Sequence, residues 1–211
     1  MRRNYFFLFT FCLLTASILF CGCGGDGPGS PGSCGTEDTG VMVDVIIVPT
    51  YQDSATFSVD AFQDICDEGP PRVFEFFATH DAEFTFTARL INPNTDFRPG
   101  RLHIEKYTIK YFRSSDSIGA PPIESDKRFM TLAITPPTGS GTTTLSTTGV
   151  FVDLNRKIQY AEDIVSGRYT SDILNNYTAV YRFEGKNDFG DNFCFEGQAN
   201  FEIADFDNCG G

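Results

Sequence analysis

The two histidines and the acidic side chains are the residues of this 211-residue chain that could do acid–base or metal chemistry. His80 stands beside Asp81 at the start of an expected strand, and His103 lies between Leu102 and Ile104 within another. Strand alternation points His103 to solvent, and neither histidine has a metal-ligating partner at a useful spacing. We therefore expect both histidines to be surface residues without a catalytic role.

The common motifs of nucleophilic, haem and phosphate chemistry are missing. The sequence has no Cys-x-x-Cys-His, no Gly-x-Ser-x-Gly and no glycine-rich phosphate loop with its Lys. A pair of carboxylates suffices for glycoside hydrolysis, but no pair stands out among the many acidic residues. The sequence therefore predicts a protein that is not an enzyme and needs no cofactor.

Calcium is the one metal with candidate ligands, because it takes about six to eight oxygen atoms, often from loops rich in Asp. Three groups of aspartates qualify: Asp60, Asp64 and Asp67; Asp188 and Asp191; Asp205 and Asp207. None of these groups matches a calcium-loop consensus. Solvated turns explain them better, and no metal site is predicted.

The first 23 residues have the layout of an export signal. Arg2 and Arg3 precede a mostly apolar run of 16 residues from Tyr5 to Phe20. That run is shorter than the roughly 20 residues that a membrane-spanning helix needs. A charged start, a short apolar middle and a small residue at the exit indicate a secretory signal peptide.

The end of this run, Phe20-Cys21-Gly22-Cys23, resembles the lipobox of bacterial lipoproteins, in which a diacylated Cys becomes the mature N-terminus. Cys23 fits that position better than Cys21, because a small Gly22 precedes it whereas a bulky Phe20 precedes Cys21. The family prefers Leu three residues before the lipidated Cys, where this chain has Phe20. The alternative is an ordinary secreted protein in which Cys-Gly-Cys is incidental.

The lipoprotein resemblance implies that residues 1–22 are a cleaved signal peptide and that Cys23 carries the acyl chains, palmitate among them. Gly24 follows, where the family's inner-membrane retention signal has Asp. The resemblance thus implies an outer-membrane protein that faces the periplasm or the cell surface.

The charge of the chain restricts its partners. Removing residues 1–22 takes away two arginines and no acid, so the formal net charge changes from −12 to −14. Nucleic acids and anionic lipid surfaces would repel such a chain. Membrane association is therefore expected through the N-terminal lipid alone.

Four cysteines lie beyond the expected anchor: Cys34, Cys66, Cys194 and Cys209. In an exported protein an even number indicates disulfides rather than metal ligands, although several pairings are possible. A Cys66–Cys209 bridge would tie the C-terminus back to the first strands. That pairing leaves Cys34 for Cys194, whose strand alternation points it away from the core.

Composition divides the remaining chain into two parts, a Gly-rich tether over residues 23–40 and one domain over residues 41–211. Alternating apolar residues predict strands over residues 41–47, 84–90, 102–111, 128–134, 144–152, 177–183 and 193–203. The alternation shifts by one at Glu105-Lys106, which predicts a bulge. A short helix over Ile158–Ile164 and one turn over Ala61–Cys66 are the only helices expected. These elements predict an antiparallel β-sandwich of about seven or eight strands.

The last two strands resemble those of immunoglobulin-like and fibronectin type III-like domains over about 30 residues. Tyr177 stands where such domains have the Tyr that hydrogen-bonds to an upstream backbone group, and Ala179 where an antibody domain has its second Cys. The loop from Asn187 to Gly190 is similar to the fibronectin loop. The buried Trp and inter-sheet Cys pair of antibody domains are absent.

Two functions are compatible with these features. The first is a lipid-anchored, non-catalytic envelope protein that presents a β-sandwich for binding or assembly. The second is a lipoprotein that binds a carbohydrate or small molecule, with or without calcium. Aromatic side chains gathered on one exposed sheet face would favour the second, and a polar face with an accessible sheet edge the first. The partner is thus expected to be an envelope protein or a glycan.

Overall fold

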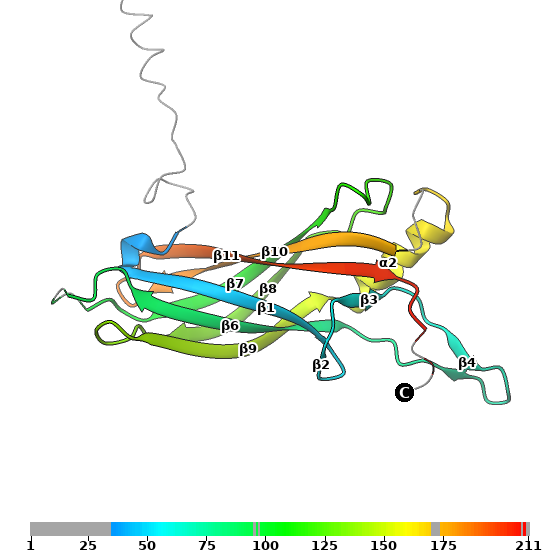
Figure 1. Ribbon diagram of the computed structural model, residues 1–211, viewed down its shortest axis with the longest axis horizontal. Coiled ribbons are helices and arrows are strands. Elements are labelled where there is room, and N and C mark those ends of the chain that lie inside the picture. The colour runs from blue at the N-terminus through cyan, green and yellow to red at the C-terminus, as the bar shows by residue number, and fades with distance from the viewer. Residues whose placement is uncertain (1–34, 95, 97, 170–173, 208, 210–211) are drawn as a thin grey trace, which may run out of the picture. The chain divides into compact units, whose positions relative to one another are not determined.

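The computed structural model describes residues 35–94, 96, 98–169, 174–207 and 209, which form a β-sandwich (Figure 1). Its elements are η1 (Glu37–Thr39), β1 (Val41–Tyr51), β2 (Ser54–Ala55), β3 (Ser58–Asp60), β4 (Ile65–Asp67), β5 (Val73–Phe74), β6 (His80–Leu90), β7 (Leu102–Arg113), β8 (Asp126–Ile134), β9 (Thr142–Val152), α2 (Leu154–Val165), β10 (Leu174–Asn187) and β11 (Asn192–Ala204). All seven predicted strands are present, and most extend a few residues beyond the predicted bounds.

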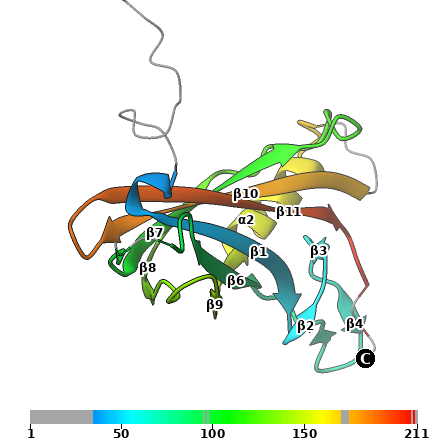
Figure 2. The same ribbon diagram turned by 60° about the vertical axis from the view of Figure 1, so that its left-hand side comes forward.

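Two sheets make the sandwich, with strand orders β2-β1-β6-β9 and β3-β11-β10-β7-β8, and the hairpin β4-β5 stands apart (Figure 2). Every pairing is antiparallel except that of β3 with β11. Seven of the strands in the described residues are long. Of these, the first, second and fifth (β1, β6 and β9) share one sheet, and the other four (β7, β8, β10 and β11) share the other. In constant-type immunoglobulin domains strands A, B, E and D face strands C, F and G, so the division here differs in its fourth long strand, β8, which joins the larger sheet. The predicted fold class is confirmed.

The β7 bulge lies where the sequence predicts it. Ile104 pairs with Gly185 of β10 and Lys106 pairs with the adjacent Glu184, so Glu105 is the extra residue on this side of β7. On the other side the register with β8 also shifts, because Ile104 pairs with Leu132 and Lys106 with Phe129. A Cβ atom on Gly185 would lie 1.9 Å from the carbonyl oxygen of His103, so the bulge requires glycine there.

Aromatic rings from both sheets fill the space between them. The Phe84 ring of one sheet meets Tyr181 and Phe183 of the other edge to face, with centroids 5.2 Å apart in both pairs. Phe86 packs in the same way on Phe183, at 5.1 Å. These rings are less than 2 % exposed, and the edge-to-face geometry adds to the free energy gained from burying them.

The folded unit begins before Val41, the first residue of the predicted domain. The carbonyl oxygen of Gly35 accepts a hydrogen bond from the amide of Cys194, and that of Gly40 accepts one from Ile91. Cys194 is therefore only 5 % exposed, although it lies in the outward phase of β11. Cys194 is disulfide-bonded, and its expected partner, Cys34, lies outside the described residues.

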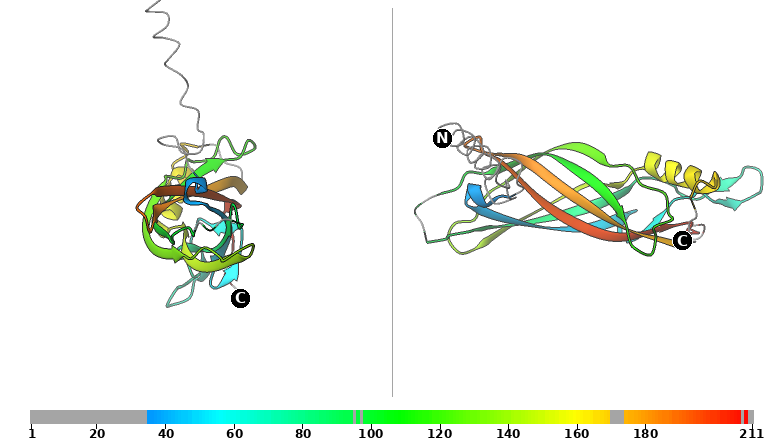
Figure 3. Two further views of the ribbon diagram at one scale, coloured as in Figure 1. Left: turned by 90° about the vertical axis from the view of Figure 1, so that its left-hand side faces the viewer. Right: turned by 90° about the horizontal axis from the view of Figure 1, so that it is seen from above.

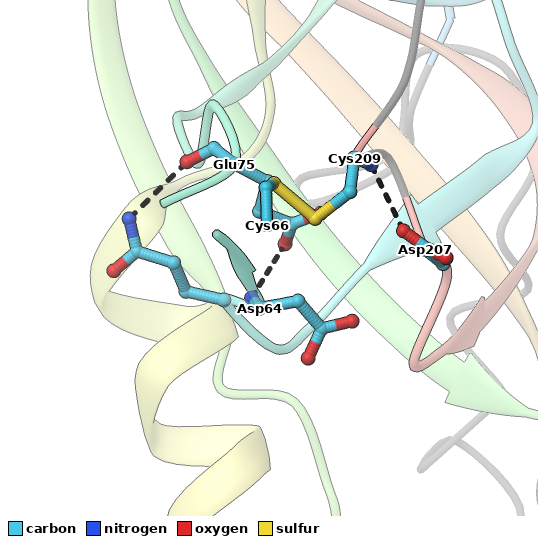
Figure 4. Close-up of a disulfide and its surroundings, with 6 residues drawn as sticks. Asp64, Cys66, Glu75, Asp207 and Cys209 are labelled. Atoms are coloured by element: carbon cyan, nitrogen blue, oxygen red, sulfur yellow. Dashed lines mark hydrogen bonds between the residues drawn. A yellow bond between two sulfur atoms is a disulfide. The ribbon is translucent and has the colours of Figure 1, made fainter. Parts of the chain in front are cut away.

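The predicted Cys66–Cys209 disulfide is confirmed, with Cα atoms 5.0 Å apart (Figure 4). It joins β4 to the C-terminal segment that follows β11. The helical turn predicted over Ala61–Cys66 is wrong. The carboxylate of Asp60 instead accepts a hydrogen bond from the amide of Phe62, and Ile65 begins strand β4.

Tyr177 is buried and hydrogen-bonded, as predicted, but its acceptor is distant in sequence. Its hydroxyl donates to the carbonyl oxygen of Pro121 at 2.5 Å, in the connection between β7 and β8. The bond is thus not the local one of a tyrosine corner, in which the acceptor is a few residues upstream.

Replacing Tyr177 with Phe is expected to lower the free energy of unfolding by about 1–3 kcal/mol, because the buried carbonyl of Pro121 loses its donor. The ring remains packed, so the fold should persist. Chemical denaturation checks this, and a variant as stable as the parent would show that the bond contributes nothing.

Candidate functional site

Helix α2 is longer than predicted, because a network of charged groups fixes its start. The carboxylate of Asp153 accepts a hydrogen bond from the amide of Arg156 at 3.0 Å, which caps the helix. The guanidinium group of Arg156 returns to Asp153 and also donates to the carbonyl oxygens of Glu124 and Ser125. The helix is thereby held against the β7–β8 connection.

The orientation of α2 is the unusual feature of this region. Its buried side chains are Lys157, Tyr160 and Asp163. An apolar stripe spaced by four, three and four residues lies on another face, with two half-buried members, Leu154 and Ala161, and two exposed ones, Ile158 and Val165. Ile158 is 43 % exposed and Val165 is 79 % exposed. A stripe of this spacing normally packs against the core.

A groove of about 590 Å³ runs along this stripe. Its opposite wall comes from the segment between β3 and β6: Ala61, Phe62, Gln63 and Phe77. The side chain of Gln63 holds that segment in place by donating to the carbonyl oxygen of Glu75 at 3.3 Å. The groove is thus lined mainly by apolar side chains from two elements far apart in the sequence.

Acidic residues lie in and beside this groove. Glu162 belongs to its lining, and Asp64 follows Gln63 of the opposite wall. Burial raises the pKa of Asp64, and the nearby carboxylates of Asp205, Glu75 and Asp207 raise it further. Figure 4 shows Asp64, Glu75 and Asp207 around the disulfide, next to α2.

A buried lysine lies beneath the groove. Lys157 is fully buried, and its ammonium group donates to the carbonyl oxygen of Ala78 at 3.0 Å. The same group lies 3.9 Å from the centroid of the Phe77 ring and 5.4 Å from that of Tyr51. Burial lowers the pKa of Lys157 to about 8, against the attraction of nearby carboxylates.

Two carboxyl groups accompany this lysine. Asp60 is 2 % exposed and Glu75 is 5 % exposed. Burial, followed by a hydrogen bond with the Glu75 side chain, raises the pKa of Asp60 to about 6. Asp60 also accepts hydrogen bonds from the amides of Phe62 and Phe206, both at 3.2 Å. The pair links β3 to the segment before β6 and to the C-terminal segment.

The surface position predicted for His80 is wrong. The side chain is 1 % exposed and stacks on Tyr51, with ring centroids 4.2 Å apart. Within the described part of the chain, neither ring nitrogen has a hydrogen-bond partner. Burial, and then the charge of Lys157, lowers the pKa of His80 to about 3. The phase of β6 could have predicted this, because His80 lies on the same side as Ala82 and Phe84.

The other predicted site residues do not join this cluster. His103 is partly exposed, and its Nε2 lies 2.6 Å from the carboxylate of Asp188. Hydrogen bonds from His103 and then from Arg101 lower the pKa of Asp188 to about 2. Asp191 accepts a hydrogen bond from Asn187. In the described ranges, no three His, Cys, Asp or Glu side chains are grouped so as to hold a metal ion.

The expected anchor Cys23 and the signal peptide of residues 1–22 lie outside the described residues. None of the helices in the described ranges is both long enough and apolar enough to cross a membrane.

No protein-family model, curated protein or solved structure matches this chain. A function therefore has to be inferred from its own residues.

Proposed function

We propose that the chain is a lipid-anchored, non-catalytic outer-membrane protein that binds another envelope protein in the groove beside α2. The observation that carries this proposal is the uncovered apolar stripe that includes Ile158 and Val165, which are 43 % and 79 % exposed. Leaving such a stripe in water forfeits the free energy of burying it, so a partner that covers it gains that free energy.

The burial of the ionisable groups supports a binding function over catalysis. Lys157, His80 and Asp60 are each no more than 2 % exposed. A molecule held in the groove would contact the apolar lining above them. General acid–base catalysis needs a group within hydrogen-bond reach of the substrate, and these groups have no such access.

The faces of the described sheets support a protein partner over a glycan. Two exposed aromatics on the outer face of the larger sheet are separated: Phe129 lies opposite Lys106 and Phe112 lies opposite Thr178. An aromatic platform for sugar rings would need such side chains side by side.

The arrangement of the ends suits an anchored binding protein. The described chain starts beside the β10–β11 hairpin, whereas α2 and β4 lie at the opposite end of the sandwich (Figure 3). A lipid attached upstream of Gly35 would therefore join the domain at the end remote from the groove.

The anchor is tested by mass spectrometry of the N-terminal peptide of the exported protein. We expect the mature chain to begin at Cys23 with its acyl chains, because Gly22 suits the lipoprotein signal peptidase. A mature chain that begins at Cys21, or an unacylated start further along, would exclude this anchor.

The charge around the groove specifies the partner as an apolar segment with basic residues. A peptide of Leu and Lys with a single Trp is a suitable probe, because the chain itself has no Trp. Residues 24–211, exported without lipid, are expected to shift the Trp emission of this peptide to shorter wavelength and to saturate. Ile158→Lys should weaken binding by about tenfold or more, through lost apolar contact and added like charge.

Two controls make this measurement specific to the groove. Ile46→Lys makes the same change on an exposed residue of β1, and binding should be unchanged. A Leu/Glu peptide should not bind. Equal loss in both lysine variants, or equal binding of both peptides, would contradict the proposed site.

A further inference from the structure

Strand β9 forms the open edge of the smaller sheet. It pairs with β6 alone, from Asp81 opposite Val150 to Arg89 opposite Thr142, without interruption. Its sequence, TTTLSTTGVFV, contains no charged residue and no proline. An uncharged, regular edge of this length offers unpaired backbone groups to another strand.

The other sheet edges in the described ranges are protected. Strand β8 contains Asp126, Lys127 and Arg128, and its register shifts opposite the β7 bulge. Strands β2 and β3 have only two and three residues, and the edges that they leave unpaired, on β1 and β11, lie against each other. Charge, irregularity and shortness are the usual protections of sheet edges. From Thr142 to Val150 strand β9 has none of them, and its one register shift lies beyond this stretch, between Val150 and Val152.

Tyrosine hydroxyls bind the backbone at one end of the β9 edge and show which of its backbone groups point away from β6. The amide of Val150 donates to the hydroxyl of Tyr107 at 3.0 Å, and its carbonyl oxygen accepts from Tyr181 at 2.9 Å. The backbone of Val150 thus points away from β6. Because this direction alternates along an antiparallel strand, the same holds for every second residue before it: Thr148, Ser146, Thr144 and Thr142.

We propose that β9 pairs antiparallel with β9 of a second copy of this chain, about a two-fold axis at Leu145. The segment from Thr142 to Thr148 is nearly palindromic, and this register sets Thr142 opposite Thr148 and Thr144 opposite Ser146 of the second copy. Both are pairs of residues whose backbone groups point outward. The register therefore satisfies all of those groups at once, with about eight hydrogen bonds.

The near-palindrome of the edge favours a second copy over a foreign strand, because one segment supplies both halves of the register. The chain carries a formal net charge of −12, so two copies repel each other over most of their surface. At β9 no like charges meet, and Thr–Thr and Thr–Ser pairs are favourable across antiparallel strands. The interface is small, which predicts a weak dimer that gains from sharing one membrane.

Cysteine cross-linking in cells tests the register with the full chain. In this arrangement the two Leu145 residues form a non-hydrogen-bonded pair with Cα atoms about 4.5 Å apart, within disulfide range. Leu145→Cys should therefore give a disulfide-linked dimer on non-reducing gels. Thr143→Cys is the matched control, because its two copies would lie about 13 Å apart along the strands.

Charge reversal tests the same pairing without relying on Leu145 alone. Adding Thr144→Lys and Ser146→Lys to Leu145→Cys places lysines opposite each other, and dimer formation should fall by about tenfold. Co-expression with a longer tagged chain that carries Thr144→Glu, Ser146→Glu and Leu145→Cys should restore a mixed dimer. Thr144 and Ser146 are exposed, so a melting temperature equal to that of Leu145→Cys alone confirms that the charged variants fold.

Three results would overturn the proposal. The first is a Leu145→Cys chain that stays monomeric, and the second is equal cross-linking of Thr143→Cys. The third is cross-linking of Leu145→Cys to a different protein, which would identify β9 as a site for a foreign strand.

Discussion

Replacing Lys157 with Ala is expected to lower the free energy of unfolding by about 2–5 kcal/mol, whereas Lys157→Met should stay within about 1 kcal/mol of the parent at pH 7. The side chain is fully buried under α2, so Ala removes its aliphatic stem and leaves a cavity. Met fills most of the same space but carries no charge.

The pKa of Lys157 explains why the loss of charge should cost little. Burial lowers this pKa from 10.5 to about 8, despite the attraction of Asp60 and Glu75. The surroundings therefore oppose the ammonium form on balance. Met loses the hydrogen bond to Ala78, but it also avoids burying that charge.

The lowered pKa of Lys157 also determines whether the stability of the fold rises or falls with pH. Between about pH 8 and pH 10.5 the unfolded chain holds a proton on Lys157 that the folded chain has released. The stability of the parent therefore rises with pH in this window, and the Met variant lacks this contribution. From pH 7 to pH 9.5 the parent should gain about 2 kcal/mol over Lys157→Met.

Denaturation of parent, Ala and Met variants at both pH values measures these effects. If Lys157→Met were as unstable as Lys157→Ala at pH 7, the ammonium group rather than the stem would hold α2 in place.

The long strands could be predicted because their pattern is local. Phe84, Phe86 and Ala88 alternate in the sequence, and they alternate in the structure because one face of β6 meets the core. The bulge at Glu105 was equally predictable, since one extra residue shifts the phase of all that follow. The Cys66–Cys209 disulfide followed from an even number of cysteines and from the position of Cys209 near the C-terminus.

The groove could not be predicted in the same way. An apolar stripe and a lysine on one helix normally indicate that the stripe is buried, whereas α2 buries Lys157 and exposes Ile158. This inversion depends on Asp60, Glu75 and Ala78, which lie 79 to 97 residues before Lys157 in the chain. Long-range partners of this kind leave no periodic signal, so the sequence predicted a short helix but not its orientation.

Replacing His80 with Phe is expected to stabilise the fold, and more so in acid. At pH 7 the change removes two buried ring nitrogens without partners in the described structure, a gain of about 1–3 kcal/mol. The Phe ring can keep the stacking on Tyr51, which has a centroid distance of 4.2 Å in the parent. The gain at pH 5 should be about 2 kcal/mol larger.

The sign of this pH effect follows from the pKa of His80, which burial lowers from 6.5 to about 3. Between these values the unfolded chain binds a proton that the folded chain does not, so the stability of the parent falls as the pH falls. Asp60 acts in the opposite direction, because its pKa is raised from 3.8 to about 6. In the parent the two effects offset each other between about pH 4 and pH 6.

Asp60 is common to both proteins, so its contribution cancels in their difference. His80→Phe should become more stable relative to the parent from pH 6.5 downward because the variant lacks the His80 titration that destabilises the parent in acid. Thermal unfolding of both proteins at pH 7 and pH 5 tests this, since groups common to both cancel in the difference. His103→Gln is the matched control, because it loses a partly exposed contact with Asp188 and should raise the melting temperature at neither pH. If the stability difference between His80→Phe and the parent did not change with pH, His80 would have the same pKa in the folded and unfolded chains. The lowered pKa of the buried His80 would then be wrong.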